Sequence, residues 1–256
     1  MSPQILSWPM IECALERVAV IEAMEAGFRA YSAGEAVIPP VGEMQLHNPQ
    51  GDVHIKYGYL RSGRHYVVKI ASGFYDNPAL GLPSSQGLML LFAQKTGVLE
   101  AILLDEGRLT DIRTGAAGAV AARYLGPSVV EGIGVIGAGI QARRQLESLL
   151  EVTDCRRVFV WSRDVERVDA YLDDISGLGF HGTRASNPAE VAAKANLIVT
   201  TTPSTEPLMR AEWVRPGTHI TAVGSDTAEK QELAPELVAG ADIVVADSIS
   251  QCLTRG

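Results

Sequence analysis

The sequence contains little cysteine and little positive charge, and each shortage excludes a class of protein. Among its 256 residues the three cysteines, Cys13, Cys155 and Cys252, are odd in number and far apart. Such a set predicts no disulfide framework and is typical of a protein in the reducing cytoplasm. Lys and Arg number 22 against 30 Asp and Glu, which gives a net charge of −8. That balance disfavours nucleic acid and anionic membranes as partners.

Long hydrophobic runs, a basic N-terminal stretch and metal-ligand spacings are also scarce, so we expect no membrane span, signal peptide or metal site. No apolar run approaches the roughly 20 residues that cross a bilayer. Residues 1–16 have no basic stretch of the kind that opens a signal peptide. The five histidines stand at no ligand spacing, so we expect no metal site.

What the sequence does contain is a glycine-rich turn between an apolar run and a helix. Gly137 and Gly139 follow a run that ends at Ile136, and Ala142 completes the pattern G-x-G-x-x-A. The first glycine makes the turn, the second lets backbone approach a pyrophosphate, and the alanine lets helix and strand pack closely. The helix N-terminus presents free N–H groups to phosphates. The stretch predicts a dinucleotide-binding turn.

The chain around this turn alternates strands and helices. Strands are expected at 133–136, 157–161, 179–184, 197–201, 218–223 and 242–246, and helices at 140–151, 164–176, 187–194 and 231–239. Six strands with crossover helices predict an α/β fold, with a doubly wound Rossmann sheet in residues 113–256. Because the sequence stops just after the sixth strand, we expect a C-terminal return segment to be missing.

Residues 1–112 follow another pattern, that of an α+β domain. Apolar residues at helical spacing predict a helix over 11–33 that ends at Gly34. Alternation within 41–72 predicts an antiparallel hairpin that turns at 61–64. Two more strands are expected at 87–92 and 101–104, and a helix rich in Ala and Gly at 109–125.

Ligands of such sheets bind at the carboxyl ends of the strands, and this rule selects four segments. They are residues 137–141, 162–163, 201–202 and 223–226. In NAD sites an acid usually ends the second strand. Here Ser162 and Arg163 follow the strand, and the acid, Asp164, comes only after them. A guanidinium there suits a 2′-phosphate, which favours NADP over NAD, unless Arg163 is a solvated loop residue.

Three ionisable residues are candidates for the chemistry. Asp226 ends a strand and could exchange a proton or hold an ammonium, or else cap a helix over 227–239. Lys69 could hold a carboxylate or act as a base, or else be a surface lysine. Arg113, in an apolar helix, calls for an anion, either a ligand or a structural ion-pair partner. Lys56 alone is interpreted as a surface residue.

Together these segments resemble the ornithine cyclodeaminase/mu-crystallin family. The resemblance implies that Lys69 and Arg113 hold the substrate carboxylate, and that Asp226 handles the amine or imine and relays protons. It also implies that Ser84 contacts the cofactor, that Lys230 lies beside the nicotinamide ribose, and that the N-terminal sheet forms a homodimer. The matching runs are Val67–Lys69, Asn77–Pro78, Gly81–Ser84, Leu109–Gly118, Ile136–Ala142, Thr201–Pro203, Val223–Asp226 and Lys230–Leu233.

The sequence departs from the family pattern at three places. Val41 stands where ornithine-binding members carry an arginine. Lys56 stands where cyclodeaminases carry a glutamate that faces the distal ammonium of ornithine. The Lys56 ammonium would repel that group, and at a few ångströms the repulsion costs on the order of a few kcal/mol. Lys56 could instead replace the lost arginine or meet a distal carboxylate. Ser162 and Arg163 replace the acid of NAD-type members.

We therefore predict an NAD(P)-dependent oxidoreductase that transfers hydride to or from the α-carbon of a small 2-imino or 2-amino acid. Such an enzyme is an imine reductase or an amino-acid dehydrogenase. Ornithine cyclodeaminase and a non-catalytic NADPH-binding protein are the alternatives. The predicted cofactor-binding residues are Ser84, Arg113, Gly137, Gly139, Ile140, Gln141, Ser162, Arg163, Thr201, Thr202, Val223, Gly224, Ser225 and Lys230.

Overall fold

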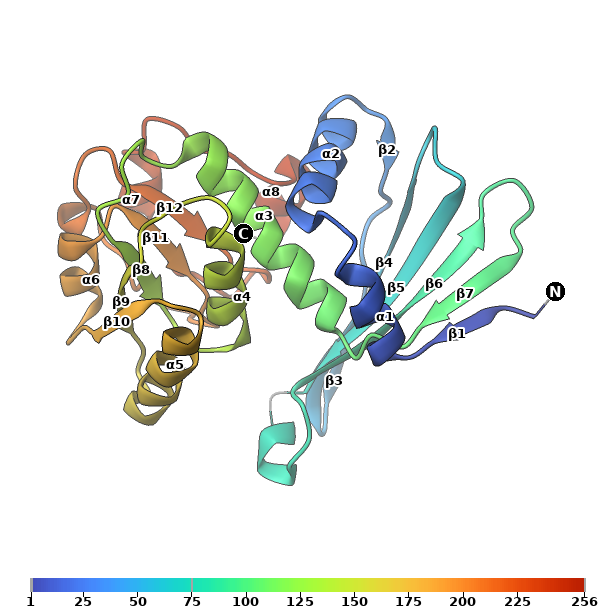
Figure 1. The fold of residues 1–256 in the computed structure, drawn as a ribbon, viewed down its shortest axis with the longest axis horizontal. Coiled ribbons are helices and arrows are strands. Elements are labelled where there is room, and N and C mark those ends of the chain that lie inside the picture. The colour runs from blue at the N-terminus through green and yellow to red at the C-terminus, as the bar shows by residue number, and fades with distance from the viewer. Residues whose placement is uncertain (1, 75, 256) are drawn as a thin grey trace. The chain divides into compact units, whose positions relative to one another are not determined.

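A computed structural model describes residues 2–74 and 76–255 (Figure 1). The chain divides into two compact units, residues 1–113 and residues 114–256. None of the helices in the described residues is long and apolar enough to cross a bilayer.

Unit 1 is built on a seven-stranded sheet whose long central strands are drawn side by side in Figure 1. The strand order is β1-β7-β6-β5-β4-β2, and β3 also pairs with β4. All pairings are antiparallel except that of β1 with β7. The strands are β1 (Gln4–Leu6), β2 (Ala36–Val37), β3 (Gly42–His47), β4 (Gln50–Leu60), β5 (His65–Gly73), β6 (Ser85–Ala93) and β7 (Leu99–Leu103), and the short helix η1 (Asn77–Leu80) precedes β6.

The helix predicted over 11–33 is wrong as a single element. The structure has α1 (Trp8–Leu15) and α2 (Val20–Ser32), separated by a short break. Ile11 and Ile21 are both buried, yet ten residues at about 100° each would set them roughly 80° apart on one straight helix. The break lets both side chains reach the core, and apolar spacing alone does not reveal it. Gly34 ends α2 in the left-handed conformation, with φ +73°, as predicted.

One face of the unit 1 sheet is apolar and remains accessible. Residues directly opposite each other on paired strands lie on the same face, so the register defines the set. None of its members is buried in the described chain, and Tyr57 is 43% exposed. We call this set the apolar sheet face: Ile55, Tyr57, Tyr59, Tyr66, Val68, Ile70, Leu88, Leu90, Phe92 and Ile102.

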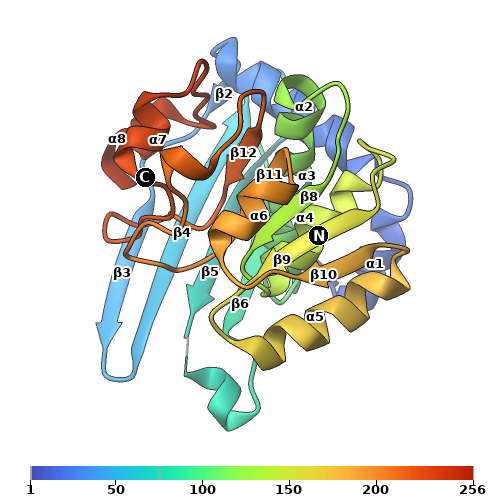
Figure 2. The ribbon, with the colours of Figure 1, turned by 90° about the vertical axis from the view of Figure 1, so that its left-hand side faces the viewer.

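Unit 2 contains a parallel five-stranded sheet in the order β10-β9-β8-β11-β12. Figure 2 shows α6 on the near face of this sheet, with α3 and α4 behind it. The predicted α/β doubly wound fold is therefore confirmed. The strands are β8 (Ile133–Ile136), β9 (Arg157–Trp161), β10 (His181–Arg184), β11 (Leu197–Thr200) and β12 (His219–Ala222). The helices are α3 (Arg108–Leu125), which begins in unit 1, α4 (Ile140–Leu149), α5 (Val165–Gly177), α6 (Pro188–Lys194), η2 (Ala211–Trp213), α7 (Pro235–Ala239) and α8 (Ile249–Arg255).

Alternate residues of these strands feed two buried cores, one on each face. Val135 and Val199 pack with α4 and α5, whereas Ile136 and Ile198 pack with α6. All four are at most 2% exposed. Strands that are covered on both faces form nearly continuous apolar runs. This is why residues 133–136 and 197–200 can be recognised as strands from the sequence.

The sixth strand, predicted at 242–246, is wrong. That segment pairs with none of the described strands, and Ile243, Val244 and Val245 are 64–70% exposed. β-Branched residues indicate a preference for the strand conformation, but a strand forms only where another strand can pair with it. The helix predicted over 231–239 shrinks to α7, and α8 was not predicted. Gly256, from which we expected a truncation, lies outside the described residues.

Candidate active site

The glycine-rich turn leaves β8 at Ile136 and enters α4 at Ile140. Gly137 has φ +112°, and a Cβ there would lie 2.7 Å from the Thr201 hydroxyl oxygen, so only glycine fits. A Cβ at Gly139 would meet nothing within 4 Å. Gly139 is the N-cap of α4 and has no side chain to occupy the first N–H groups. The turn therefore leaves open space in front of the first turn of α4, as a pyrophosphate site requires.

Arg143 braces this turn from inside α4 and was missed by the sequence analysis. Its guanidinium donates to the carbonyl oxygens of Ala138 at 2.9 Å and Gly139 at 3.1 Å, and to Asp174 at 2.6 Å. Ala142 is fully buried and accepts the Tyr171 hydroxyl at 3.2 Å. An arginine inside a polar helix face carries no sequence signal that separates it from a solvated one.

The segment after β9 separates the roles of two neighbouring charges. Asp164 is the N-cap of α5, accepts the Arg167 N–H at 3.2 Å, and pairs with the Arg167 side chain at 3.1 Å. Arg163 is exposed and has no hydrogen bond or ion pair within the described residues. Asp164 is thus engaged by its own helix, whereas the Arg163 guanidinium remains open to a ligand.

A buried carboxylate joins the carboxyl ends of β11 and β12. Glu232, 1% exposed, accepts the backbone N–H groups of Thr202 at 2.6 Å and Gly224 at 2.7 Å. It also accepts the hydroxyls of Thr200 and Thr202, each at 2.8 Å. These loops contain the predicted cofactor residues Thr201, Thr202, Val223, Gly224 and Ser225. The sequence analysis gave Glu232 no role because it placed residues 231–239 in a helix, whereas Glu232 lies in an irregular segment before α7.

Asp226 follows the same strand end and is 63% exposed. Its carboxylate pairs with the Lys230 ammonium at 2.5 Å, and Lys230 is 15% exposed. No helix begins at residue 227, since α7 starts at Pro235, so the interpretation of Asp226 as a helix cap is wrong. Asp226 presents an accessible carboxylate with a lysine beside it.

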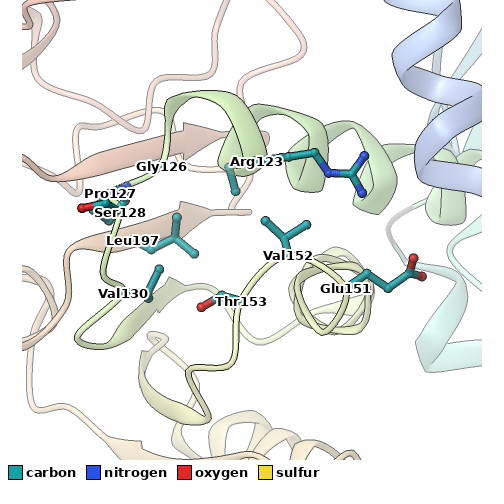
Figure 3. A pocket seen from close by; sticks show the side chains of 10 residues that line it. Arg123, Gly126, Pro127, Ser128, Val130, Glu151, Val152, Thr153 and Leu197 are labelled. Atoms are coloured by element: carbon teal, nitrogen blue, oxygen red, sulfur yellow. The ribbon is translucent and has the colours of Figure 1, made fainter.

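A cavity of unit 2 lies at the amino ends of the parallel strands, opposite their carboxyl ends. It measures about 390 Å³ and is lined by Val130, Val152 and Leu197, where β11 begins (Figure 3). Arg123 and Glu151 point away from these apolar side chains in Figure 3. It is therefore separate from the strand ends that carry the predicted site.

Unit 1 gathers three cationic side chains on the sheet face opposite the apolar one. Lys69 on β5 lies directly across from Lys56 on β4. The Lys69 ammonium donates to the Thr110 hydroxyl of α3 at 3.1 Å, and Arg113 follows one turn later on α3. Asp105, 1% exposed, accepts the Leu109 N–H at 3.1 Å at the start of this helix.

This surrounding lowers the pKa of Lys69 to about 8. Burial is the largest cause, followed by the positive charges of Arg113 and Lys56, while Asp105 and Asp111 oppose the shift. The surface interpretation of Lys69 therefore does not hold. An anion at this place would relieve the repulsion among the three cations. Ser84 lies just before β6 and Val41 just before β3, both in unit 1.

A glycine turn, a helix start without a side-chain cap and a doubly wound sheet are the features of a dinucleotide-binding fold, and unit 1 adds a cluster of three cationic side chains. The chain belongs to the ornithine cyclodeaminase/mu-crystallin family, whose model matches residues 2–256. The family predicted from the sequence is confirmed.

Known relatives support the cofactor class. The chain is 36% identical over 251 residues to the alanine dehydrogenase of Archaeoglobus fulgidus, covering 96% of this chain and 74% of that protein. An archaeal alanine dehydrogenase dimer with bound NAD superposes with a TM-score of 0.89 at 32% identity, covering 99% and 77% of the two chains. The iminosuccinate reductase of Paracoccus denitrificans with NAD+ gives 0.87 at 30%, covering 99% and 78%. These relatives are enzymes, and the predicted nicotinamide cofactor class is supported.

Proposed function

We propose that this protein is an NAD(P)-dependent oxidoreductase that acts on the α-carbon of a small 2-imino or 2-amino acid. The observation that carries the proposal is the cation cluster of Lys56, Lys69 and Arg113, because it fits a carboxylate ligand. The bound nicotinamide ring supplies or accepts the hydride. The chain's own residues bind the substrate, orient it and move its proton.

Lys69 and Arg113 hold the substrate carboxylate in this proposal. Two cations from different elements fix a carboxylate in direction as well as in place, which aligns the adjacent carbon. Lys69 has its pKa lowered to about 8 by burial and by its neighbours' charges, so binding an anion stabilises its ammonium form.

Asp226 exchanges the proton on the substrate nitrogen in this proposal. Its carboxylate is accessible, and the Lys230 ammonium at 2.5 Å holds it in one direction. Lys230 follows Asp226 by four residues and is mostly covered, so it can restrain the acid without taking part in the proton transfer.

NADP is the cofactor that we favour over NAD. Arg163 has an open guanidinium after β9, whereas Asp164, the neighbouring acid, is occupied as the cap of α5. A guanidinium binds a 2′-phosphate bidentately, while an acid in that place would bind the ribose hydroxyls. The NAD complexes of the relatives leave this preference open, so it is tested below with Arg163.

A substrate without a distal ammonium fits this cluster better than ornithine does. Lys56 adds a positive charge at the register position of Lys69, and a second amine there would be repelled. Ornithine cyclodeaminase therefore stands as the alternative reaction. A dehydrogenase or reductase changes absorbance at 340 nm in the steady state, whereas a cyclodeaminase releases ammonia with no net change.

We further propose a homodimer formed through the apolar sheet face. Its ten side chains form a continuous apolar surface on three neighbouring rows of the sheet, and none of them is buried in unit 1. Continuous apolar patches of this kind on a single chain mark protein interfaces. The central strands of unit 2, β8 and β11, are in contrast already covered by helices on both faces of their sheet.

The test of the proposed function is a substrate panel with acidic, neutral, basic and cyclic imines, run in both directions with NADH, NADPH and their oxidised forms. The expected result is steady-state turnover at 340 nm with at least one small 2-imino or 2-amino acid. Tight NADPH binding without turnover across the panel would favour the non-catalytic alternative. Ammonia release from ornithine at constant absorbance would favour the cyclodeaminase.

A further inference from the structure

A buried carboxylate in unit 2 has a task that the proposed function does not use. Both oxygens of Glu232 are fully engaged, each by one backbone N–H and one threonine hydroxyl. Within the described residues no lysine, arginine or histidine pairs with this carboxylate. A buried charge without a cation is a costly way to hold two loops together, and its hydrogen bonds must be complete to offset that cost.

The two loops that Glu232 joins lie in tight contact. A Cβ at Gly224 would clash with the Thr202 backbone and lie 2.7 Å from the carboxyl carbon of Glu232. Glu232 itself is fixed from behind, because its carbonyl oxygen accepts the N–H groups of Leu208 at 2.8 Å and Met209 at 3.1 Å. The carboxylate is therefore a rigid anchor to which the ends of β11 and β12 are attached.

We infer that Glu232 is a positioning residue that sets the orientation of the nicotinamide ring without touching the cofactor. The inference rests on the proposed function. There the glycine-rich turn after β8 takes the pyrophosphate and Arg163 after β9 takes the 2′-phosphate, so the ends of β11 and β12, on the other side of β8, are left for the nicotinamide end. A carboxylate suits this task because each of its oxygens can accept a separate backbone N–H. Among the described residues, Gly137, Gly139 and Arg163 form no hydrogen bond or ion pair with the Glu232 carboxylate, whose partners are Thr200, Thr202 and Gly224.

The test is Glu232→Gln, which keeps the shape but replaces one acceptor oxygen with an NH2 group. That NH2 must face the N–H of either Thr202 or Gly224, so one loop loses its anchor. Dissociation constants are measured for NADPH and NADH and for ADP-ribose and its 2′-phosphate, which lack the nicotinamide ring. The expected result is that the preference for the complete dinucleotide falls about tenfold while binding of the ring-less ligand is unchanged.

A second variant and a control make the result independent of general destabilisation. Thr200→Val removes one hydroxyl from the carboxylate, and Thr200 is fully buried, so it cannot contact a cofactor. In Thr200→Val the preference for the complete dinucleotide over the ring-less ligand is also expected to fall, but by less than in Glu232→Gln. Gln145→Met is the control, because Gln145 is 1% exposed and donates to the Thr114 carbonyl at 3.0 Å, away from these loops. It is expected to lower the Tm without changing the preference.

Three outcomes overturn the inference. The first is that Glu232→Gln and Thr200→Val weaken the binding of complete and ring-less ligands equally, which would show that Glu232 is only structural. An unchanged preference in a folded Glu232→Gln variant refutes the positioning role directly. Wild-type protein that binds neither ligand contradicts the proposed function as well, and this separates the failure of the function from the failure of the inference.

Discussion

Lys56 and Lys69 lie directly opposite each other on the antiparallel strands β4 and β5. Like charges in such a pair destabilise a sheet, and Arg113 adds a third positive charge. Together with burial, these charges lower the pKa of Lys69 to about 8. An arrangement that is unfavourable in the free protein becomes favourable when a carboxylate binds, and this is the property that a substrate site needs.

The first prediction is an alkaline limb in the pH profile. The Lys69 ammonium predominates below about pH 8 and is lost above it. Because the charged form binds the substrate carboxylate, kcat/KM is expected to be constant below this value and to fall about tenfold per pH unit above it. The Lys69→Arg variant keeps its charge, so its remaining activity should lack this limb. An unchanged limb in that variant would assign the titration to another group.

The second prediction concerns Lys56 and the substrate's distal group. Lys56→Met removes a charge that lowers the pKa of Lys69, so the alkaline limb should move to higher pH. Lys56→Glu should favour basic over acidic substrates by about tenfold or more in relative kcat/KM. Lys95→Met, an exposed lysine in the turn between β6 and β7, is the matched control. Identical substrate ranking in wild type and Lys56→Glu would remove Lys56 from the site.

The third prediction separates the two cofactors. Arg163→Ala should weaken NADPH about tenfold or more and leave NADH nearly unchanged, because only NADPH carries the 2′-phosphate. Fluorescence titration with each cofactor measures the effect. Arg167→Ala is the control, since Arg167 is an exposed neighbour that pairs with Asp164. Equal losses for both cofactors would contradict the NADP preference.

Some of this site could be predicted from the sequence and some could not. Strong local patterns predicted β8, the glycine-rich turn and the hairpin that turns at 61–64. A four-residue turn pairs residue 60 with 65, and the same register places Lys56 across from Lys69. That signal was present in the sequence but was not used. From its strand alone Lys56 was interpreted as a surface residue, and only the resemblance to the family placed it at the substrate.

Long-range contacts explain most of the rest. Glu232 binds groups that precede it by up to 32 positions, and no periodicity reports such a contact. The prediction of a sixth strand failed for a related reason. Ile243, Val244 and Val245 have the composition of a strand, but they pair with no strand in the described chain. Local patterns therefore located the elements, while tertiary hydrogen bonds determined which polar residues act on the strand ends.

The fourth prediction tests the acid. Asp226→Asn removes the proton acceptor but keeps the shape and most of the contact with Lys230, so turnover should fall by about 10²-fold or more. The dissociation constant for the nicotinamide cofactor should stay the same. Asp173→Asn, an exposed aspartate on α5, is the control for loss of surface charge. Turnover near that of wild type in Asp226→Asn would exclude Asp226 as the acid.

The fifth prediction concerns assembly through the apolar sheet face. Val68 lies in the middle of this face, opposite Tyr57 and Leu90, so Val68→Asp would place a charge where the proposed dimer buries apolar surface. The wild-type protein should sediment as a dimer and the variant as a folded monomer, with folding checked by circular dichroism. Val129→Asp is the control, because Val129 is 70% exposed and lies in unit 2, outside this face. A wild-type monomer, or a Val68→Asp variant that still dimerises, would show that another surface joins the subunits or that none does.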